Sequence, residues 1–582
     1  MLLATIVIPF GVDSRELEQV RPSIHPELRE HTEHFRKKIY RISDNVYSAV
    51  GWGLANTIMI VGKDGLIIVD VGEDIGSARI VREELRKISD KPVKAVIYTH
   101  FHPDHINGVK AFVSEEQVRA GEAQIIAHQS LLDNVINQGD KIGPILGIRT
   151  AYTSGAVLDP GETEGMNLGI GPNPNVGGAT FIAPTLVYDD RKRLTIAGIE
   201  LELRHVPSEA PDETAVYLPE SNILLSGETI QGPTLPNIHT LRGTKFRDPV
   251  SWYKSIDVLR SYQADHLVPS HGQPVSGKEN VETVLRATRD GIQFIHDQTV
   301  RFMNQGLTPD ELAEVVKLPP HLASVKPYLR EYYGTVEHSV RQIYQGYLGW
   351  FQGDPVALDP VPRIESARRH VALMGGRDAV MQHAHDAHTD GDFQWAAELA
   401  TYLIRIAHDD HEARNLKAAC FRHLGYAQLN TNWRNWYLTS ARELDGSLDI
   451  PAVQRRIRAA LSSPDLMEAL PIGKVIEGLS VRIDAEAVLN SEFTVAFELI
   501  DLGTVYALEV RRGVAQFHEG DGLDADVSLR TTRASLLSVL LGQTSLEQVR
   551  DSGEVDITGD APALMKLLGA LERPAPIYLT LR

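Results

Sequence analysis

The chain has 582 residues, of which 43% are hydrophobic, and its formal net charge is -19. A chain of this length exceeds the size of one hydrophobic core, so we expect about three or four domains. The acidic excess argues against nucleic acid or an anionic membrane as a partner, because like charges repel. An anionic substrate would have to be bound by local positive charge from a metal or an arginine.

The single cysteine, Cys420, excludes an intrachain disulfide. It lies in an apolar helical stretch, which favours a buried core residue over a reactive thiol. The apolar segment 1–10 has no basic residues before it and no small-residue cleavage site after it, so we interpret it as an ordinary N-terminal segment. We find no window of ~18 apolar residues that could span a membrane. We predict a cytoplasmic protein, and a periplasmic or secreted location stays open.

The first predicted elements are typical of a layered α/β domain. Residues 45–72 predict paired strands with a hairpin turn at 62–65. A helix is expected at about 77–89, and a buried strand at 93–98. The order strand, strand, helix, strand favours helices packed on a sheet.

A cluster of metal-binding residue types follows the strand at 93–98 directly. It has the pattern H-x-H-x-D-H and consists of His100, His102, Asp104 and His105. Three imidazoles and a carboxylate within six positions can hardly all face one core, but a strand end and a tight turn can direct them at a common centre. Asp104 and His105, in the turn, can serve a second metal. The pattern predicts a pair of transition metals, which suits hydrolysis.

The following region is expected to contain a long loop and more strands. A Gly-, Pro- and Asn-rich stretch at about 154–180 predicts a loop without regular structure, and such loops are often functional. Strands are expected at 194–196, 199–205, 214–218, 223–226 and 265–269.

The rest of the chain predicts two further domains. Residues from about 277 to 450 are largely helical, and the small residues of 390–445 have a spacing that resembles a tetratricopeptide helix pair. After Pro464, a separate α+β domain is expected. Its strands are predicted at 480–484, 493–497, 504–510 and 527–530, and its helices at 533–541 and 561–571.

The motif T-H-x-H-x-D-H-x-x-G at residues 99–108 resembles the signature of the metallo-β-lactamase superfamily. Segments 237–248, 295–309 and 332–355 resemble the alkylsulfatases of that superfamily, and the similarity extends over nearly the whole chain. The resemblance implies a multidomain α/β fold. Its parts would be a metallo-β-lactamase αββα sandwich at 1–310, an all-α dimerisation domain at 311–455 and an α+β domain similar to sterol-carrier protein 2 at 465–582.

The resemblance also implies the ligands of two metals. The first metal would be bound by His100, His102 and Glu209, the second by Asp104, His105 and His271, with Glu228 bridging both. Glutamates at 209 and 228, where most of the superfamily has a histidine and an aspartate, are typical of alkylsulfatases. Nitrogen and oxygen ligands predict two zinc ions, with manganese or iron as alternatives.

A sulfate head group would need fixed positive charge. Arg341, with His338 or Tyr344 nearby in the sequence, is a candidate because a planar guanidinium suits a tetrahedral oxyanion. The alternative is a structural or solvated arginine. Asn237 and Arg242, in one of the alkylsulfatase-like segments, complete the set of candidate catalytic residues.

Two positions depart from the alkylsulfatase pattern. Pro236 stands where the family tends to have a histidine, a plausible acid for the leaving group, and His239 is a possible substitute. The family also tends to have His-His-Trp-Pro at the last ligand, whereas this chain has His271-Gly-Gln-Pro274. A smaller and more polar wall there could change which alkyl chain fits.

Other conspicuous residues favour structural roles. His383, His385 and His388 on a predicted helix at 377–389 do not share one metal-binding face, so we interpret them as a solvated surface. Trp433, with Trp436 and Tyr437, could line a pocket, but core or dimer contacts are the preferred interpretation.

The leading hypothesis is a homodimeric, binuclear metal hydrolase that cleaves alkyl sulfate esters by attack of a metal-activated water. Its substrate would be a small amphiphilic anion. For the C-terminal domain we predict an apolar groove that takes the alkyl chain or shields the mouth of the active site. A related hydrolase acting on another ester or ether with an apolar tail is one alternative. A lipid-binding or carrier protein with a residual metal site is the other.

Overall fold

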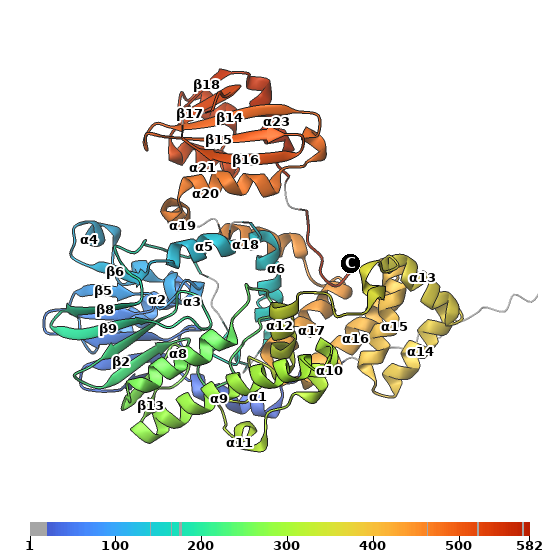
Figure 1. Ribbon diagram of the computed structural model, residues 1–582, viewed down its shortest axis with the longest axis horizontal. Coiled ribbons are helices and arrows are strands. Elements are labelled where there is room, and N and C mark those ends of the chain that lie inside the picture. Colours follow the sequence, from blue (N-terminus) through green and yellow to red (C-terminus); the bar gives the residue numbers. More distant parts are fainter. Residues whose placement is uncertain are drawn as a thin grey trace, which may run out of the picture.

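The structure is a computed structural model that describes residues 20–581, apart from 140, 164–165, 174–176, 462–463, 521–522 and 573–574. Segment 1–10, which the sequence suggests to be an ordinary N-terminal segment, lies outside the described residues. Figure 1 shows an α/β sandwich in blue and green, a helical domain in yellow and an α+β domain in orange and red.

Two mixed β-sheets form the sandwich. The first runs in chain order from β1 to β7, antiparallel up to β4 and parallel from there. Its strands are β1 Lys38–Arg41, β2 Val46–Val50, β3 Thr57–Val61, β4 Leu66–Val69, β5 Val93–Ile97, β6 Gln124–His128 and β7 Leu186–Tyr188. The second sheet has the order β13-β12-β11-β10-β9-β8. Its strands are β8 Arg191–Ile196, β9 Ile199–His205, β10 Thr214–Leu218, β11 Ile223–Gly227, β12 His266–Pro269 and β13 Val275–Ser276.

The two sheets pack face to face. Ile67 and Ile97 of the first sheet share a buried core with Leu203 and Val268 of the second. Helix α2 (Ile75–Arg86) covers the outer face of the first sheet. Helices α8 (Pro249–Ser261) and α9 (Lys278–Met303) cover the outer face of the second. This is the expected αββα order. The smaller elements are α1 Pro26–His31, η1 Thr32–Phe35, α3 Pro103–Ile106, η2 Val109–Ala111, α4 Glu115–Arg119, α5 Leu131–Gly139, α6 Gly143–Ser154 and α7 Pro160–Thr163.

The helical domain is built from paired helices. Ala396, Ala400 and Ala413 are buried where the helices meet, and such small residues allow close approach. Cys420 lies in the same core and burial raises its pKa to about 12, which confirms the structural interpretation. The elements are α10 Pro309–Val315, α11 Pro320–Ala323, α12 Val336–Leu348, η3 Pro355–Leu358, α13 Arg363–Leu373, α14 Arg377–Thr389, α15 Phe393–Ile406, α16 His411–Ala427, α17 Thr431–Leu444 and α18 Ile450–Leu461.

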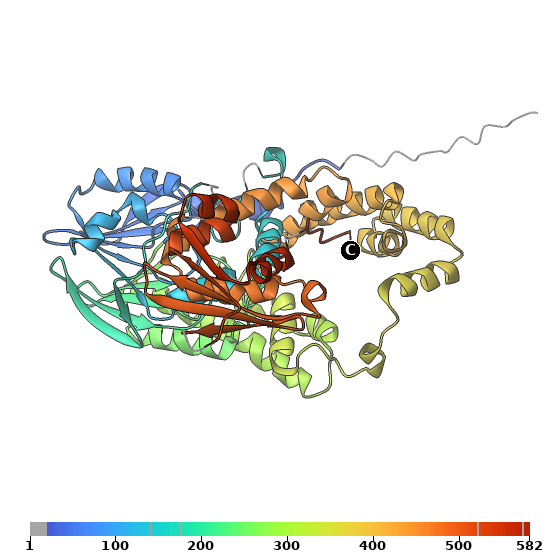
Figure 2. The same cartoon turned by 90° about the horizontal axis from the view of Figure 1, so that it is seen from above.

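The C-terminal domain lies above the other two in Figure 1, and Figure 2 views it from above. Its five-stranded sheet has the order β16-β15-β14-β17-β18. The strands are β14 Glu492–Leu499, β15 Thr504–Arg511, β16 Val514–Glu519, β17 Val527–Thr531 and β18 Val555–Gly559. The helices are α19 Pro464–Ala469, α20 Ile472–Glu477, η4 Gly478–Arg482, η5 Glu486–Val488, α21 Arg533–Leu540, α22 Leu546–Asp551 and α23 Ala561–Ala570.

The chain then returns to the helical domain. The carboxylate of Glu443 on α17 accepts the backbone N–H groups of Leu579, Thr580 and Leu581. The C-terminal tail, residues 579–581, is therefore held against α17, near the label C in Figure 1.

Two predicted segments differ from the structure. The stretch 154–180 contains the short helix α7, so it is not wholly irregular. The strand expected at 480–484 is wrong, because η4 occupies most of it. Val481 is 54% exposed, so the alternation of apolar residues there does not mark a buried face. Among the described residues, we find no helix with the length and hydrophobicity of a membrane span.

Candidate metal centre

Strand ends carry the predicted ligands to one edge of the sandwich. His100 and His102 follow β5, Glu228 follows β11 and His271 follows β12. Strands β11 and β12 are parallel, so their carboxyl ends meet on the same side. Asp104 lies in the first turn of α3, and its Oδ2 atom is 3.7 Å from Nε2 of His271.

The seven predicted ligands form two groups, and within each group the ligand atoms lie within 4.8 Å of one another. One group is His100, His102 and Glu209; the other is Asp104, His105, Glu228 and His271. In the described part of the chain, these are the groups of three or more such side chains that could hold an ion. The histidines of α14 belong to neither group.

Glu228 lies between the two groups. Its Oε1 atom is 2.6 Å from Nε2 of His271, 3.0 Å from Nε2 of His105 and 4.0 Å from Nε2 of His100. In the other group, Nδ1 of His102 is 2.9 Å from Nε2 of His100 and 3.1 Å from Oε2 of Glu209. One oxygen of Glu228 is thus near both groups, as a bridging ligand must be.

The donor set fits divalent transition metals. All of the ligands except Asp104 are buried, and Oε2 of Glu209 makes no hydrogen bond of good geometry within the described residues; its neighbour at 3.1 Å is Nδ1 of His102, an atom of the same ligand group. A buried carboxylate oxygen without a partner is costly, and a bound cation would offset that cost. Imidazole nitrogen and carboxylate oxygen suit zinc, manganese and iron.

Asp70, which the sequence reasoning missed, orients the second group. It follows β4 and accepts hydrogen bonds from N and Oγ1 of Thr99, both at 2.9 Å. Its Oδ2 atom lies 2.8 Å from Nδ1 of His105 and accepts from Ser270 at 3.1 Å. A carboxylate that accepts the Nδ1 proton leaves Nε2 of the histidine for a metal. An acidic residue directly after a buried strand was the available signal.

Glu213 touches one ligand of each group. Its Oε1 atom accepts the backbone N–H of Glu228 at 2.8 Å and lies 3.5 Å from Nδ1 of His100. Gly227 has a positive φ of 56°, and a Cβ there would collide with this oxygen. Burial raises the pKa of Glu213 well above its ordinary value. Glu213 therefore supports the position of both His100 and Glu228.

The loop 237–248 brings two arginines to the ligands. Arg247 is buried; it donates to the carboxylate of Glu209 and, at 2.6 Å, to the carbonyl oxygen of Asn237. Burial raises the pKa of Glu209, but Arg247 and His102 outweigh it and lower that pKa to about 2. Arg242 reaches within 3.2 Å of Nε2 of His102. The side-chain amide of Asn237 is buried and unpartnered among the described residues.

The other candidates from α12 have different surroundings. Arg341 faces α10 and forms ion pairs at 3.2 Å with Asp310 and Glu337. The ring of His338 is 4.9 Å from that of Trp433, and burial lowers the pKa of His338 to about 4.

Tyr344 is buried in the apolar core beneath α12. Within the described residues, Arg341, His338 and Tyr344 make no hydrogen bond or ion pair with a predicted ligand. The possible substitute acid, His239, has its Nδ1 atom 2.9 Å from Oε1 of Gln342.

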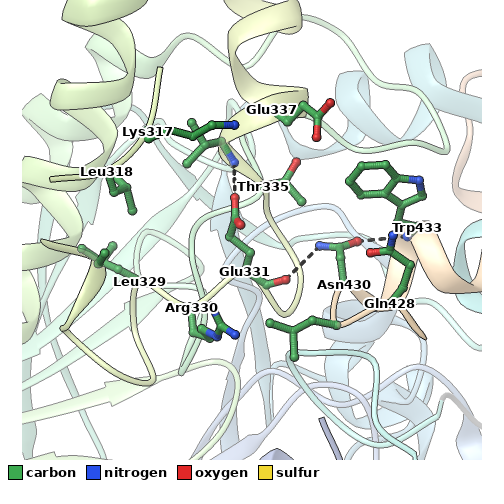
Figure 3. Close-up of a pocket in the computed structure, with 13 residues that line it drawn as sticks. Lys317, Leu318, Leu329, Arg330, Glu331, Thr335, Glu337, Gln428, Asn430 and Trp433 are labelled. Atoms are coloured by element: carbon green, nitrogen blue, oxygen red, sulfur yellow. Dashed lines mark hydrogen bonds between the residues drawn. The ribbon is translucent and has the colours of Figure 1, made fainter. Parts of the chain in front are cut away.

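A separate cavity of about 250 Å³ lies where segment 317–337 meets segment 428–433 (Figure 3). Trp433 lines this cavity, as the less favoured of its two interpretations from the sequence would have it. Polar groups of the cavity wall form hydrogen bonds with one another. Glu331 accepts the backbone N–H of Val336 at 2.6 Å, and Asn430 donates to the carbonyl oxygen of Glu331 at 3.2 Å. None of the lining residues is a predicted metal ligand.

Family models match most of the chain. The metallo-beta-lactamase superfamily matches residues 50–271, alkyl sulfatase dimerisation matches 308–447 and alkyl sulfatase C-terminal matches 460–579.

Full-length relatives agree with these matches. A linear primary-alkylsulfatase of a Pseudomonas strain is 56% identical over 90% of this chain and 100% of its own length. A second linear primary-alkylsulfatase from Pseudomonas is 33% identical over 92% of this chain and 79% of its own length. Among solved structures, a double mutant of the sec-alkyl sulfatase PisA1 matches with a TM-score of 0.87 and 30% identity, covering 97% of this chain and 89% of that one.

Proposed function

The chain belongs to the alkylsulfatase family of the metallo-beta-lactamase superfamily, and we propose that it hydrolyses linear primary alkyl sulfates at a binuclear metal centre. The preference for primary esters rests on the relative that is 56% identical and acts on them. The sec-alkyl sulfatase structure is more distant, at 30% identity.

One observation carries the proposal: two groups of metal-ligand residues lie side by side and are linked through Glu228. We propose zinc as the metal of both groups, because the donors are imidazole and carboxylate. When bound, two such ions supply Lewis acidity and lower the pKa of a water so that it can attack the ester. The surrounding residues Asp70 and Glu213 hold the ligands in place.

We assign the sulfate head group to Arg242 and Asn237. Among the described residues, Arg242 has no carboxylate within ion-pair distance, whereas Arg247 is committed to Glu209 and Arg341 to Asp310 and Glu337. In a chain with a net charge of -19, a guanidinium beside the ligands that is not paired with a carboxylate is the local positive charge that an anionic substrate needs. The unpartnered amide of Asn237 supplies further hydrogen bonds.

The other two domains would serve this site. We propose that the helical domain forms a homodimer, consistent with the dimerisation model that matches it. We propose that the C-terminal domain, as a domain similar to sterol-carrier protein 2, takes the alkyl chain in an apolar groove. A single cysteine favours a reducing compartment, so we place the enzyme in the cytoplasm.

The test is to incubate the metal-loaded protein with dodecyl sulfate and with secondary alkyl sulfates of the same length, and to follow inorganic sulfate. We expect release from both classes, faster from the primary ester, and none above background from His102→Ala. Water labelled with oxygen-18 would show which ester bond is cleaved. No sulfate release from any ester by fully loaded protein would refute the proposal.

A further inference from the structure

Helix α6 holds the loop that carries Arg242. The guanidinium of Arg149, on α6, donates from Nε to the carbonyl oxygen of Arg242 at 2.8 Å and from Nη2 to that of Leu241 at 2.6 Å. From these contacts we propose that Arg149 is a positioning residue, which fixes the backbone of Arg242 so that its side chain stays at the metal centre. The inference rests on the proposed function, in which Arg242 binds the sulfate head.

The geometry requires arginine. Two N–H groups of one planar guanidinium donate to the successive carbonyl oxygens of Leu241 and Arg242. This pair of hydrogen bonds fixes both the position and the orientation of the peptide group between the two residues. A lysine ammonium group does not present two N–H donors in one fixed plane. Arg242 itself sits in a loop outside any helix or strand, and the next residue, Gly243, has a positive φ of 98°. The local chain therefore supplies little rigidity of its own.

Arg149 is itself held by the helical domain. Its guanidinium carbon lies 5.1 Å from the ring centroid of Trp436 on α17, within the range of a cation–π interaction. The indole N–H of Trp436 donates to Oγ1 of Thr153 on α6 at 2.9 Å. The hydroxyl of Tyr152, also on α6, donates to Glu443, the same carboxylate that binds the tail at residues 579–581.

These contacts form one continuous path. Glu443 on α17 binds both the tail and Tyr152 on α6, and Trp436 on α17 stacks on Arg149. Arg149 then bonds to the backbone of Arg242, whose side chain reaches His102. The predicted dimerisation domain thus contributes to the substrate site of its own chain, through a residue that touches neither metal ligand nor substrate. Arg149 is also partly buried, and burial lowers its pKa.

The experiment compares Arg149→Met, Arg149→Lys and a matched control, Arg289→Met. Arg289 is also partly buried, lies in the same domain on α9 and stacks 5.3 Å from the Tyr253 ring, but it bonds to Asp257 and not to the loop. The readouts are the Kd for inorganic sulfate by calorimetry on metal-loaded protein, the KM and kcat for dodecyl sulfate, the metal content and the Tm. Each Arg149 variant is also made in an Arg242→Met background.

We expect Arg149→Met to raise the Kd for sulfate and the KM about tenfold, with metal content unchanged. Arg149→Lys should fall between this variant and the wild type, and Arg289→Met should match the wild type. In the Arg242→Met background, Arg149→Met should have no further effect, because its role acts through Arg242.

Equal sulfate affinity in Arg149→Met and Arg289→Met would overturn the inference. So would full additivity of the Arg149 and Arg242 substitutions, since that would mean a general structural role. A wild type that hydrolyses alkyl sulfates while Arg149→Met and Arg149→Lys keep its KM refutes only the positioning role. A wild type that neither binds sulfate nor releases it refutes the proposed function and this inference with it.

Discussion

Removing the carboxylate of Glu213 should weaken metal binding without removing a ligand. In Glu213→Ala, the backbone N–H of Glu228 loses the acceptor that now lies 2.8 Å away, and His100 loses the oxygen 3.5 Å from its Nδ1 atom. A buried donor left without a partner costs about 1–3 kcal/mol. Because about 1.4 kcal/mol is tenfold in an equilibrium constant, the Kd for metal should rise about 10- to 100-fold.

The control is Glu213→Gln, which keeps the side-chain length and an oxygen that can accept from Glu228. Its Kd for zinc should stay within about threefold of the wild type. Competition with a chelator of known affinity gives both constants, and thermal unfolding reports whether each variant is folded. Folded Glu213→Ala protein with the metal affinity of Glu213→Gln would refute the argument that Glu213 supports the ligands.

His102→Ala should bind one metal fewer by elemental analysis and release no sulfate above background, because it lacks one ligand of the first group; unchanged turnover would favour a carrier function. Burial raises the pKa of Glu202, but hydrogen bonds from Arg191 and Tyr262 outweigh burial and lower this pKa from 4.5 to about 2. The ionised Glu202 therefore stabilises the fold fully above pH 4.5, and this stabilisation is lost as the pH falls toward 2. The difference in unfolding free energy between wild type and Glu202→Gln, from urea titrations, should shrink over that range, and a constant difference would contradict this. Deleting residues from about 465 onward should raise the KM far more for long-chain than for short-chain esters, and equal effects would argue against an alkyl-binding groove.

Much of the fold could be predicted because its signals are local. The hairpin between β3 and β4 has a Gly-Lys-Asp-Gly turn at 62–65 between apolar runs, and the structure pairs these strands in antiparallel fashion. The H-x-H-x-D-H pattern is short enough for one strand end and one turn to bring its residues together. Glu209, Glu228 and His271 are distant in sequence, and only the resemblance to alkylsulfatases placed them with His100.

The sequence named Arg341, Asn237 and Arg242 together as candidate catalytic residues, and it could not rank them because their directions depend on the fold. Arg341 stood out because it is near His338 and Tyr344 in sequence, but on a helix its direction is set by the face it occupies, and it faces Asp310 on α10. Arg149 belongs to no motif, and the position of Asp70 directly after β4 does not show which residues it contacts. Their roles arise from backbone groups and ligands that the fold brings to them across large sequence separations.

The most direct test of the binuclear centre is a titration of metal-free protein with zinc, following bound metal and dodecyl sulfate turnover together. We predict that turnover rises until two ions are bound per chain and then stays constant, and that Glu228→Ala weakens the binding of both ions. Full turnover at one ion per chain, or in protein that a chelator has stripped of metal, would contradict the account.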